Sequence, residues 1–183
     1  WRVPSYSAWS EARDATPIYR EFARILRTDT AHRGLADRRR VLKVPVFSEN
    51  LPELLSAFPD ARLILATRAL DDVHRSAVSL VANQMTVQSD SCDLAWIEAD
   101  WHRKIDLREG RRAAVLRAWS GPITQLTFED LSDDWETAIG RAYRELDLDL
   151  TPAALRAMRR VSAQSQTGSH RAHAAQLSGF ARA

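Results

Sequence analysis

The sequence is nearly devoid of cysteine, and this scarcity excludes two kinds of architecture. Cys92 is the only cysteine among the 183 residues. An internal disulfide therefore cannot form, and no cluster of thiols is available for a structural zinc ion. We expect Cys92 to be a small, unreactive side chain, because unpaired cysteines in proteins are usually buried.

Long apolar runs are missing as well. No stretch of about 18 residues is both apolar and free of charge, so no transmembrane segment is predicted. The beginning of the chain does not show the charged stretch followed by an apolar stretch that is typical of a signal peptide for export. The simplest expectation is therefore a cytoplasmic protein.

Lysine is the third scarce residue. Arginine outnumbers lysine by 24 to 2, although the formal net charge is only +2. We attribute this bias to genomic composition rather than to nucleic-acid binding, so no nucleic-acid partner is expected. The bias draws attention to Lys43 and Lys104, since each retains an ammonium in a chain that otherwise uses guanidinium. Genetic drift is the rival account, and we prefer it for Lys104.

Composition and length indicate one soluble globular domain over residues 1–183, because 45% of the residues are apolar and 27% are charged. The chain begins at Trp1 without a methionine, and its first strand pattern comes only near residue 40. We therefore expect that a segment precedes Trp1 in the whole protein. The end of the chain, residues 162–183, is rich in Ser, Gln, Gly, Ala and His and predicts a mobile tail.

A strand, a helix and a second strand are predicted one after another near the middle of the chain. Residues 41–44 read as a short strand that ends at Pro45, because proline lacks the N–H that a ladder needs. Residues 50–58 read as a helix with Asn50 as its cap, and residues 62–67 read as the second strand. Such a succession predicts a βαβ unit with parallel strands, which places Lys43 and Arg68 at one edge of the sheet.

An anion site is predicted where the second strand ends. Arg68 follows this strand, and the N-terminus of the next helix has unpaired N–H groups that attract anions. The planar guanidinium matches phosphate oxygens. Asp71 or Asp72 can cap this helix, which would place the hydroxyl of Ser76 on its inward face. The alternative is that Arg68 is a solvated end of the strand and Ser76 bonds its own backbone.

The other elements are mostly helices. Tryptophans at helical spacing predict a long helical region over residues 93–119, and we expect Trp96, Trp101 and Trp119 to pack in a core or to line an apolar pocket. The remaining predictions are a helix over residues 16–27, a strand over 123–128, a helix capped by Asp133 or Asp134, and a final helix opened by Thr151-Pro152. The sequence therefore predicts a helix-rich α/β fold.

Several of these segments together resemble the bacterial branch of the sulfotransferase family. The resemblance is carried by Val41-Leu-Lys43-Val-Pro45, by Phe58-Pro-Asp-Ala-Arg-Leu-Ile with Thr67-Arg68, and by Ser76. The stretches Tyr19 to Leu26, Leu126-Thr-Phe-Glu-Asp-Leu131, Asp134-Trp135 and Leu148 to Pro152 are similar to the same family. The resemblance covers most of the chain and implies a P-loop-like, three-layer α/β domain with a short parallel sheet flanked by helices.

The resemblance implies transfer of a sulfuryl group from 3′-phosphoadenosine 5′-phosphosulfate to a hydroxyl or amine of a small or lipid-like acceptor. By similarity, Arg68 and Ser76 would hold the 3′-phosphate and Lys43 would stand near the transferring group. Arg171, in a late basic segment, is a third candidate for the 3′-phosphate. No metal is expected, because His170 and His173 lack a third ligand.

Three departures from the family leave other functions open. No loop that could cradle the 5′-phosphosulfate follows Trp1, Phe47 lies near the place of a histidine that is a candidate base in relatives, and Arg68-Ala69-Leu70 replaces Arg-Asp-Pro. One alternative is a non-catalytic nucleotide-binding or scaffold relative. Another is a helical interaction domain that uses an arginine-rich surface. The acceptor and the oligomeric state stay open.

Overall fold

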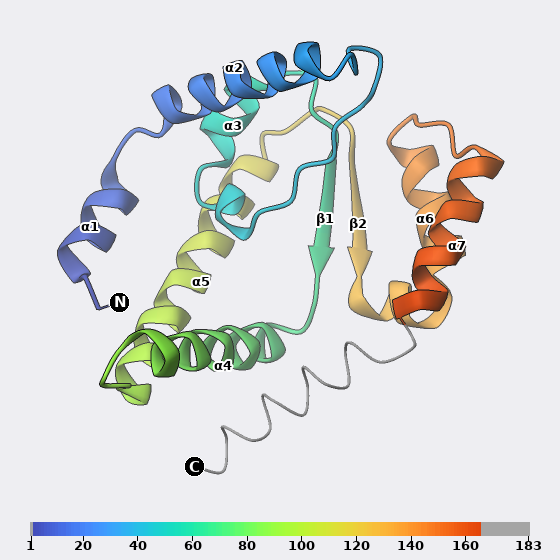
Figure 1. Ribbon diagram of the computed structural model, residues 1–183. Coiled ribbons are helices and arrows are strands. Elements are labelled where there is room, and N and C mark those ends of the chain that lie inside the picture. Colours follow the sequence, from blue (N-terminus) through green and yellow to red (C-terminus); the bar gives the residue numbers. More distant parts are fainter. Residues whose placement is uncertain (1, 166–183) are drawn as a thin grey trace. The chain divides into compact units, whose positions relative to one another are not determined.

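The computed structural model describes residues 2–165, which form a helix-rich α/β fold (Figure 1). The elements follow the chain in the order α1 (Pro4–Ala12), α2 (Thr16–His32), the 3-10 helix η1 (Pro45–Ser48), α3 (Leu51–Ala57), β1 (Leu63–Thr67), α4 (Leu70–Gln88), α5 (Leu94–Leu116), β2 (Ile123–Thr127), α6 (Phe128–Glu145) and α7 (Pro152–Ser165). The predicted fold class, a helix-rich α/β protein with a short parallel sheet, is confirmed.

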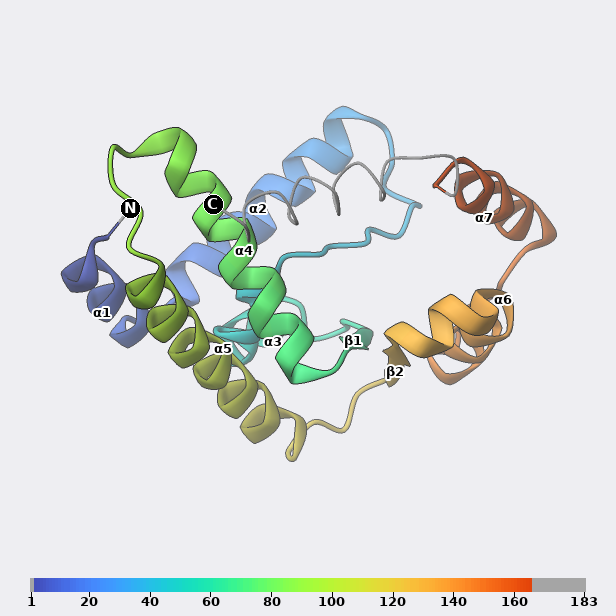
Figure 2. The same cartoon turned by 90° about the horizontal axis from the view of Figure 1, so that it is seen from below.

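The described residues divide into two compact units, each drawn from separate parts of the chain. The first contains Arg62–His102 and the chain from Pro122 onward, and therefore holds the sheet, α4, the beginning of α5, α6 and α7 (Figure 2). The second contains Arg2–Ala61 and Arg103–Gly121, with α1, α2, η1, α3 and the rest of α5. That residues 1–183 form one domain stays a prediction.

The sheet consists of β1 and β2, which run parallel and in register. Leu63 lies opposite Ile123 at one end, and Thr67 lies opposite Thr127 at the other. Both strands were predictable to within a residue, because each is a short run of mainly aliphatic and β-branched residues that follows a turn signal, Pro59-Asp60 before β1 and Gly121-Pro122 before β2. Since the two strands end level with each other, α4 and α6 both begin at the same edge of the sheet (Figure 1).

The strand predicted over residues 41–44 is wrong. These residues are extended but belong to no ladder within residues 2–165, and Val41 is 91% exposed. Pro45 begins η1 instead of ending a strand. The predicted βαβ unit is therefore also wrong, because β1 pairs with β2 and the chain between them passes through α4 and α5. A strand pattern indicates that a segment is able to pair, but which strand it pairs with depends on the tertiary structure.

Leu126 is the centre of the apolar core of the first unit. It is 4% exposed and packs with Ala138, Ala142 and Ile139 of α6. Two alanines on this face allow the helix backbone to approach the sheet closely. At the far end of α6, Arg62 Nε donates to the carbonyl oxygen of Leu146 over 2.6 Å, which ties the helix end to the beginning of β1.

The second unit is held by apolar packing between α2 and α3 and by arginines of α5. Its buried residues include Tyr19, Ala23, Leu51, Leu54 and Leu55. The ring of Phe47 lies 6.2 Å from that of Tyr19 and 6.3 Å from that of Phe22, measured between centroids. On α5, Arg103 forms two hydrogen bonds of 2.8 and 2.9 Å to the Glu11 carboxylate, and Arg108 pairs with Glu49 at 2.5 Å.

Several local predictions are tested by these elements. Asp93 and Thr151 cap α5 and α7 as side-chain acceptors, whereas Asn50 occupies the cap of α3 without a side-chain bond. The tryptophans Trp96, Trp101 and Trp119 are half-buried, and so is Cys92. α7 continues to Ser165, so the tail predicted from Ser162 begins inside a helix. None of the helices in residues 2–165 combines the length and apolar character needed to span a bilayer.

Tyr19 makes the stability of the fold sensitive to alkaline pH. Burial raises the pKa of the Tyr19 phenol above its ordinary value of 10.0, partly offset by its hydrogen bond with Asn50. A folded-state pKa above the unfolded one means that the stabilisation is complete below pH 10 and is lost as the pH rises through that range. We expect the free energy of unfolding to fall more steeply above about pH 9.5 in the unaltered chain than in Tyr19→Phe. Urea unfolding at a series of pH values measures this, and parallel curves for the two proteins would contradict it.

Candidate functional site

The carboxyl edge of the sheet is where the predicted anion site has to form. Thr67 and Thr127 end the two strands side by side, and the first turns of α4 and α6 follow them after two residues and none, respectively. The first N–H groups of a helix have no partner within the helix and carry partial positive charge. Two such helix beginnings at one sheet edge favour an anionic ligand there.

Arg68 projects from this edge. Its side chain is 42% exposed, and its Nε lies 3.4 Å from Oδ2 of Asp72 in the first turn of α4. Its Cζ lies 5.1 Å from the centroid of the Phe128 ring, at the beginning of α6. The pair with Asp72 engages Nε and leaves the two terminal nitrogens, which can donate to a phosphate in the plane of the guanidinium.

Ser76 lies on α4 but not on its inward face. It is exposed, whereas Val73 and Ala77 on either side are half-buried, so the predicted inward direction of its hydroxyl is wrong. Ser76 lies on the same side of α4 as Asp72, because positions four apart share one side of a helix, and Arg68 pairs with Asp72 from just before the helix. The predicted capping by Asp71 or Asp72 is also wrong: Ala69 is the cap, without a side-chain bond, and the acidic residues lie in the first turn.

The other two predicted site residues lie elsewhere. Lys43 is exposed on the extended stretch before η1 and belongs to the second unit, so its meeting with Arg68 stays a prediction. Arg171, like His170 and His173, lies outside the described residues. The residue near the place of the family's candidate base, Phe47, is half-buried against the aromatic rings of α2.

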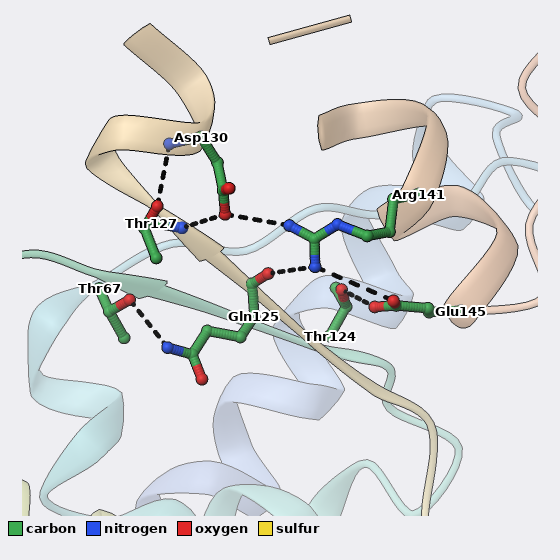
Figure 3. A network of polar contacts seen from close by, with 7 residues as sticks. All are labelled: Thr67, Thr124, Gln125, Thr127, Asp130, Arg141 and Glu145. Atoms are coloured by element: carbon green, nitrogen blue, oxygen red, sulfur yellow. Dashed lines mark hydrogen bonds and ion pairs between the residues drawn. The ribbon is translucent and has the colours of Figure 1, made fainter. Parts of the chain in front are cut away.

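A network of hydrogen bonds organises the edge where β2 passes into α6 (Figure 3). Gln125 Nε2 donates to Thr67 Oγ1 over 3.2 Å, which joins the two strands beside Arg68. Thr127 Oγ1 accepts from the Asp130 N–H, and Asp130 Oδ2 accepts from the Thr127 N–H, which together make a capping box. Arg141 donates to Asp130 Oδ2 over 3.0 Å and to the Gln125 carbonyl oxygen over 3.2 Å.

Comparison of the sequence with models of known protein families shows to which family this chain belongs. Residues 4–152 match the model of the sulfotransferase family. The chain belongs to the sulfotransferase family. No curated protein and no solved structure gives a significant match. The matched range includes Lys43, Arg68 and Ser76, and it ends before Arg171.

Membership of the sulfotransferase family gives a chemical reason for an arginine and two helix beginnings to lie at one edge. Sulfuryl transfer, like phosphoryl transfer, spreads negative charge over the moving group and the leaving oxygen, so an enzyme mainly positions the reactants and neutralises that charge. At this edge Arg68 supplies a positive charge, and the first N–H groups of α4 and α6 carry partial positive charge beside the carboxylates of the same turns, which are Asp71, Asp72, Glu129 and Asp130.

Two residues of this edge had no signal in the sequence that pointed to it. Phe128 was expected to end a strand, but it is the first residue of α6 and is 54% exposed beside Arg68. Arg141 belongs to no motif, although its position eleven residues after Asp130 in a helix could have indicated that the two residues share one side of it. Its hydrogen bonds depend on how α6 lies on β2, which a linear pattern does not state. The Thr127 N–H, together with Arg141, lowers the pKa of the Asp130 carboxyl, because both favour its anionic form.

Proposed function

We propose that this sulfotransferase moves a sulfuryl group from 3′-phosphoadenosine 5′-phosphosulfate to a hydroxyl or amine of a small or lipid-like acceptor. The acceptor atom attacks sulfur, the bond between sulfur and the phosphate oxygen breaks, and the acceptor loses a proton. The products are the sulfated acceptor and adenosine 3′,5′-bisphosphate. We assign the reaction to the cytoplasm of a bacterium, as the composition and the resemblance favour.

The observation that carries this proposal is the position of Arg68 at the carboxyl edge of the sheet. Its terminal nitrogens and the exposed hydroxyl of Ser76 would hold the 3′-phosphate, which distinguishes this donor from nucleotides that lack it. The exposed ring of Phe128 offers a flat apolar face on which a planar base can stack. A phosphate contact and a stacking surface side by side are the features that a nucleotide requires.

Lys43 and Arg171 complete the proposed donor site. The ammonium of Lys43 would neutralise charge on the transferring group, and Arg171 would add a further contact to the 3′-phosphate. The cationic side chains supply the charge neutralisation, so the proposal assigns no role to a metal ion. The half-buried tryptophans Trp96 and Trp101 are candidates for an apolar acceptor surface.

Replacement of Arg68 by alanine tests the phosphate contact. Calorimetry should show that the unaltered chain binds adenosine 3′,5′-bisphosphate in preference to adenosine 5′-phosphate. In Arg68→Ala we expect this preference to fall about 10- to 100-fold, because a charge-assisted hydrogen bond contributes on the order of 1.5–3 kcal/mol.

Arg75→Ala is the matched control for this experiment. Arg75 lies on α4 and pairs with the carboxylate of Asp72, as Arg68 does from just before the helix, but the side chain of Arg75 is 77% exposed. Arg75→Ala should leave the preference for adenosine 3′,5′-bisphosphate over adenosine 5′-phosphate unchanged. Equal binding of the two nucleotides by the unaltered chain would overturn the proposed donor, and an equal loss in both variants would show that the effect comes from Asp72 rather than from Arg68.

A second candidate function is binding of the nucleotide without transfer. It is favoured by Phe47, whose ring cannot accept a proton and packs against Tyr19 and Phe22. In that case adenosine 3′,5′-bisphosphate would bind with the same preference, but labelled donor would yield no sulfated product with any acceptor of a broad panel. Product formation with any acceptor would exclude this candidate.

A further inference from the structure

The helix α6 is broken within its second turn. Asp134 has φ −150° and ψ 79°, far from helical values, and its Oδ1 accepts the Thr137 N–H over 3.1 Å. Asp134 therefore caps a second helical segment over residues 135–145. It is one of the two residues that were predicted to cap a helix there. The turn over residues 128–133 is separated from this segment, so the regular helical ladder does not continue through it to the rest of α6.

Arg141 bridges this break. It belongs to the second segment, and it reaches back to Asp130 in the first turn and to the carbonyl oxygen of Gln125 in β2 (Figure 3). One guanidinium thus joins the strand, the first turn and the second segment of the helix. A lysine would be a poor replacement, because its compact ammonium lacks the planar fork with which a guanidinium donates to two acceptors from fixed directions.

The turn that Arg141 secures is the turn that carries Phe128. The capping box of Thr127 and Asp130 fixes the turn at its beginning, and the acceptor of Arg141 is the same Asp130 carboxylate. We propose that Arg141 is a positioning residue for the nucleotide site, which holds the turn over residues 128–133 on β2 so that Phe128 stays beside Arg68 and stacks on the base. This inference rests on the proposed function, because it assumes that a nucleotide occupies the edge.

Hydrogen exchange tests the structural half of this proposal without a ligand. In Arg141→Gln, we expect the Thr127 and Asp130 amides to exchange about 3- to 10-fold faster, because the turn opens locally. Amides over residues 138–145 should keep their rates. Arg144→Gln removes an exposed arginine from the same helix and should change neither set. Unchanged exchange at Thr127 and Asp130 in Arg141→Gln would overturn the proposal.

A double-mutant cycle tests the functional half. Calorimetry with adenosine 3′,5′-bisphosphate should show that Phe128→Ala weakens binding about 5- to 20-fold in the unaltered background, as expected for loss of one stacked base. In the Arg141→Gln background the same substitution should weaken binding less than about 2-fold, because the ring is no longer held in place. The Arg144→Gln background should retain the whole effect of Phe128→Ala.

The outcomes separate this inference from the proposed function. An undiminished effect of Phe128→Ala in Arg141→Gln, with nucleotide still bound, would overturn the positioning role and leave the proposed function standing. A lack of binding by the unaltered chain would overturn the proposed function and the site role of Arg141 together. The exchange rates would then still decide whether Arg141 holds the turn.

Discussion

Replacement of Lys43 by alanine should lower the rate of sulfuryl transfer by about 10²- to 10³-fold, the cost of removing one group that stabilises developing charge. Lys43 is proposed to neutralise the transferring group, so its loss acts on the transition state more than on nucleotide binding. Affinity for adenosine 3′,5′-bisphosphate, which lacks the sulfuryl group, should change little. Transfer of labelled sulfuryl at saturating donor measures the rate.

Two variants make this result specific to Lys43. Lys104 is the only other lysine of the chain, and Lys104→Ala should transfer at nearly the unaltered rate. Lys43→Arg keeps a positive charge but replaces the compact ammonium by a planar guanidinium, so this variant should retain part of the activity. An unchanged rate in Lys43→Ala would contradict the proposed role, as would an equal loss in Lys104→Ala. Lys43 is exposed, so its replacement should leave the free energy of unfolding nearly unchanged.

Replacement of Leu126 by alanine should lower the free energy of unfolding by about 2–5 kcal/mol, the range for large-to-small changes in a packed core. Leu126 is 4% exposed and packs on Ala138 and Ala142, which are too small to fill the cavity that the substitution leaves. The cost is therefore expected to come both from lost apolar burial and from the unfilled space. Urea unfolding followed by circular dichroism measures it.

Ile123→Ala on the same strand is the control for Leu126→Ala. Ile123 is 36% exposed, so its truncation should cost markedly less. Equal losses in the two variants would show that the strand, rather than the contact with α6, determines the stability. Leu126 lies between Gln125 and Thr127, so Leu126→Ala should also weaken nucleotide binding by loosening the edge that these residues form.

The interaction-domain alternative is weakened by where the arginines of this chain lie. Many guanidinium groups are matched by carboxylates of the same unit, as in Arg40 with Asp29, Arg103 with Glu11 and Arg159 with Glu136. Charge that is paired within the molecule offers less attraction to an acidic partner. Exposed pairs of this kind contribute little to stability, about 0–1 kcal/mol each, so their main effect is on the surface field.

Elements with a complete local signal were predictable from the sequence. Each of the two strands is a short run of mainly aliphatic and β-branched residues that follows a turn signal, and both lie within a residue of the predicted bounds. Asp93, Asp134 and Thr151 cap helices because a short oxygen-bearing side chain satisfies N–H groups only a few residues away. Residues 41–44 show the opposite case. Their pattern is that of a strand, but the strand with which they were predicted to pair, β1, pairs with β2 instead.

The candidate site divides in the same way. That Arg68 ends a strand and precedes a helix follows from contiguous residues, and the carboxyl edge of a sheet was therefore expected as the site. The meeting of Arg68 with Phe128, and the bridge from Arg141 to Asp130 and Gln125, join residues that are far apart in the chain. They depend on the pairing of β1 with β2 and on the packing of α6, which are tertiary facts.

By itself, the sequence determined the two strands, most of the helices and the arginine at the carboxyl edge, because each of these is encoded by residues that are close together in the chain. It also determined the family, through motifs spread over residues 4–152. The tertiary structure alone decided that β1 pairs with β2, that Ser76 faces outward and that Arg141 holds the turn of Phe128. Those outcomes depend on competition among partners distant in the chain, and that competition is settled by burial and hydrogen bonding in three dimensions.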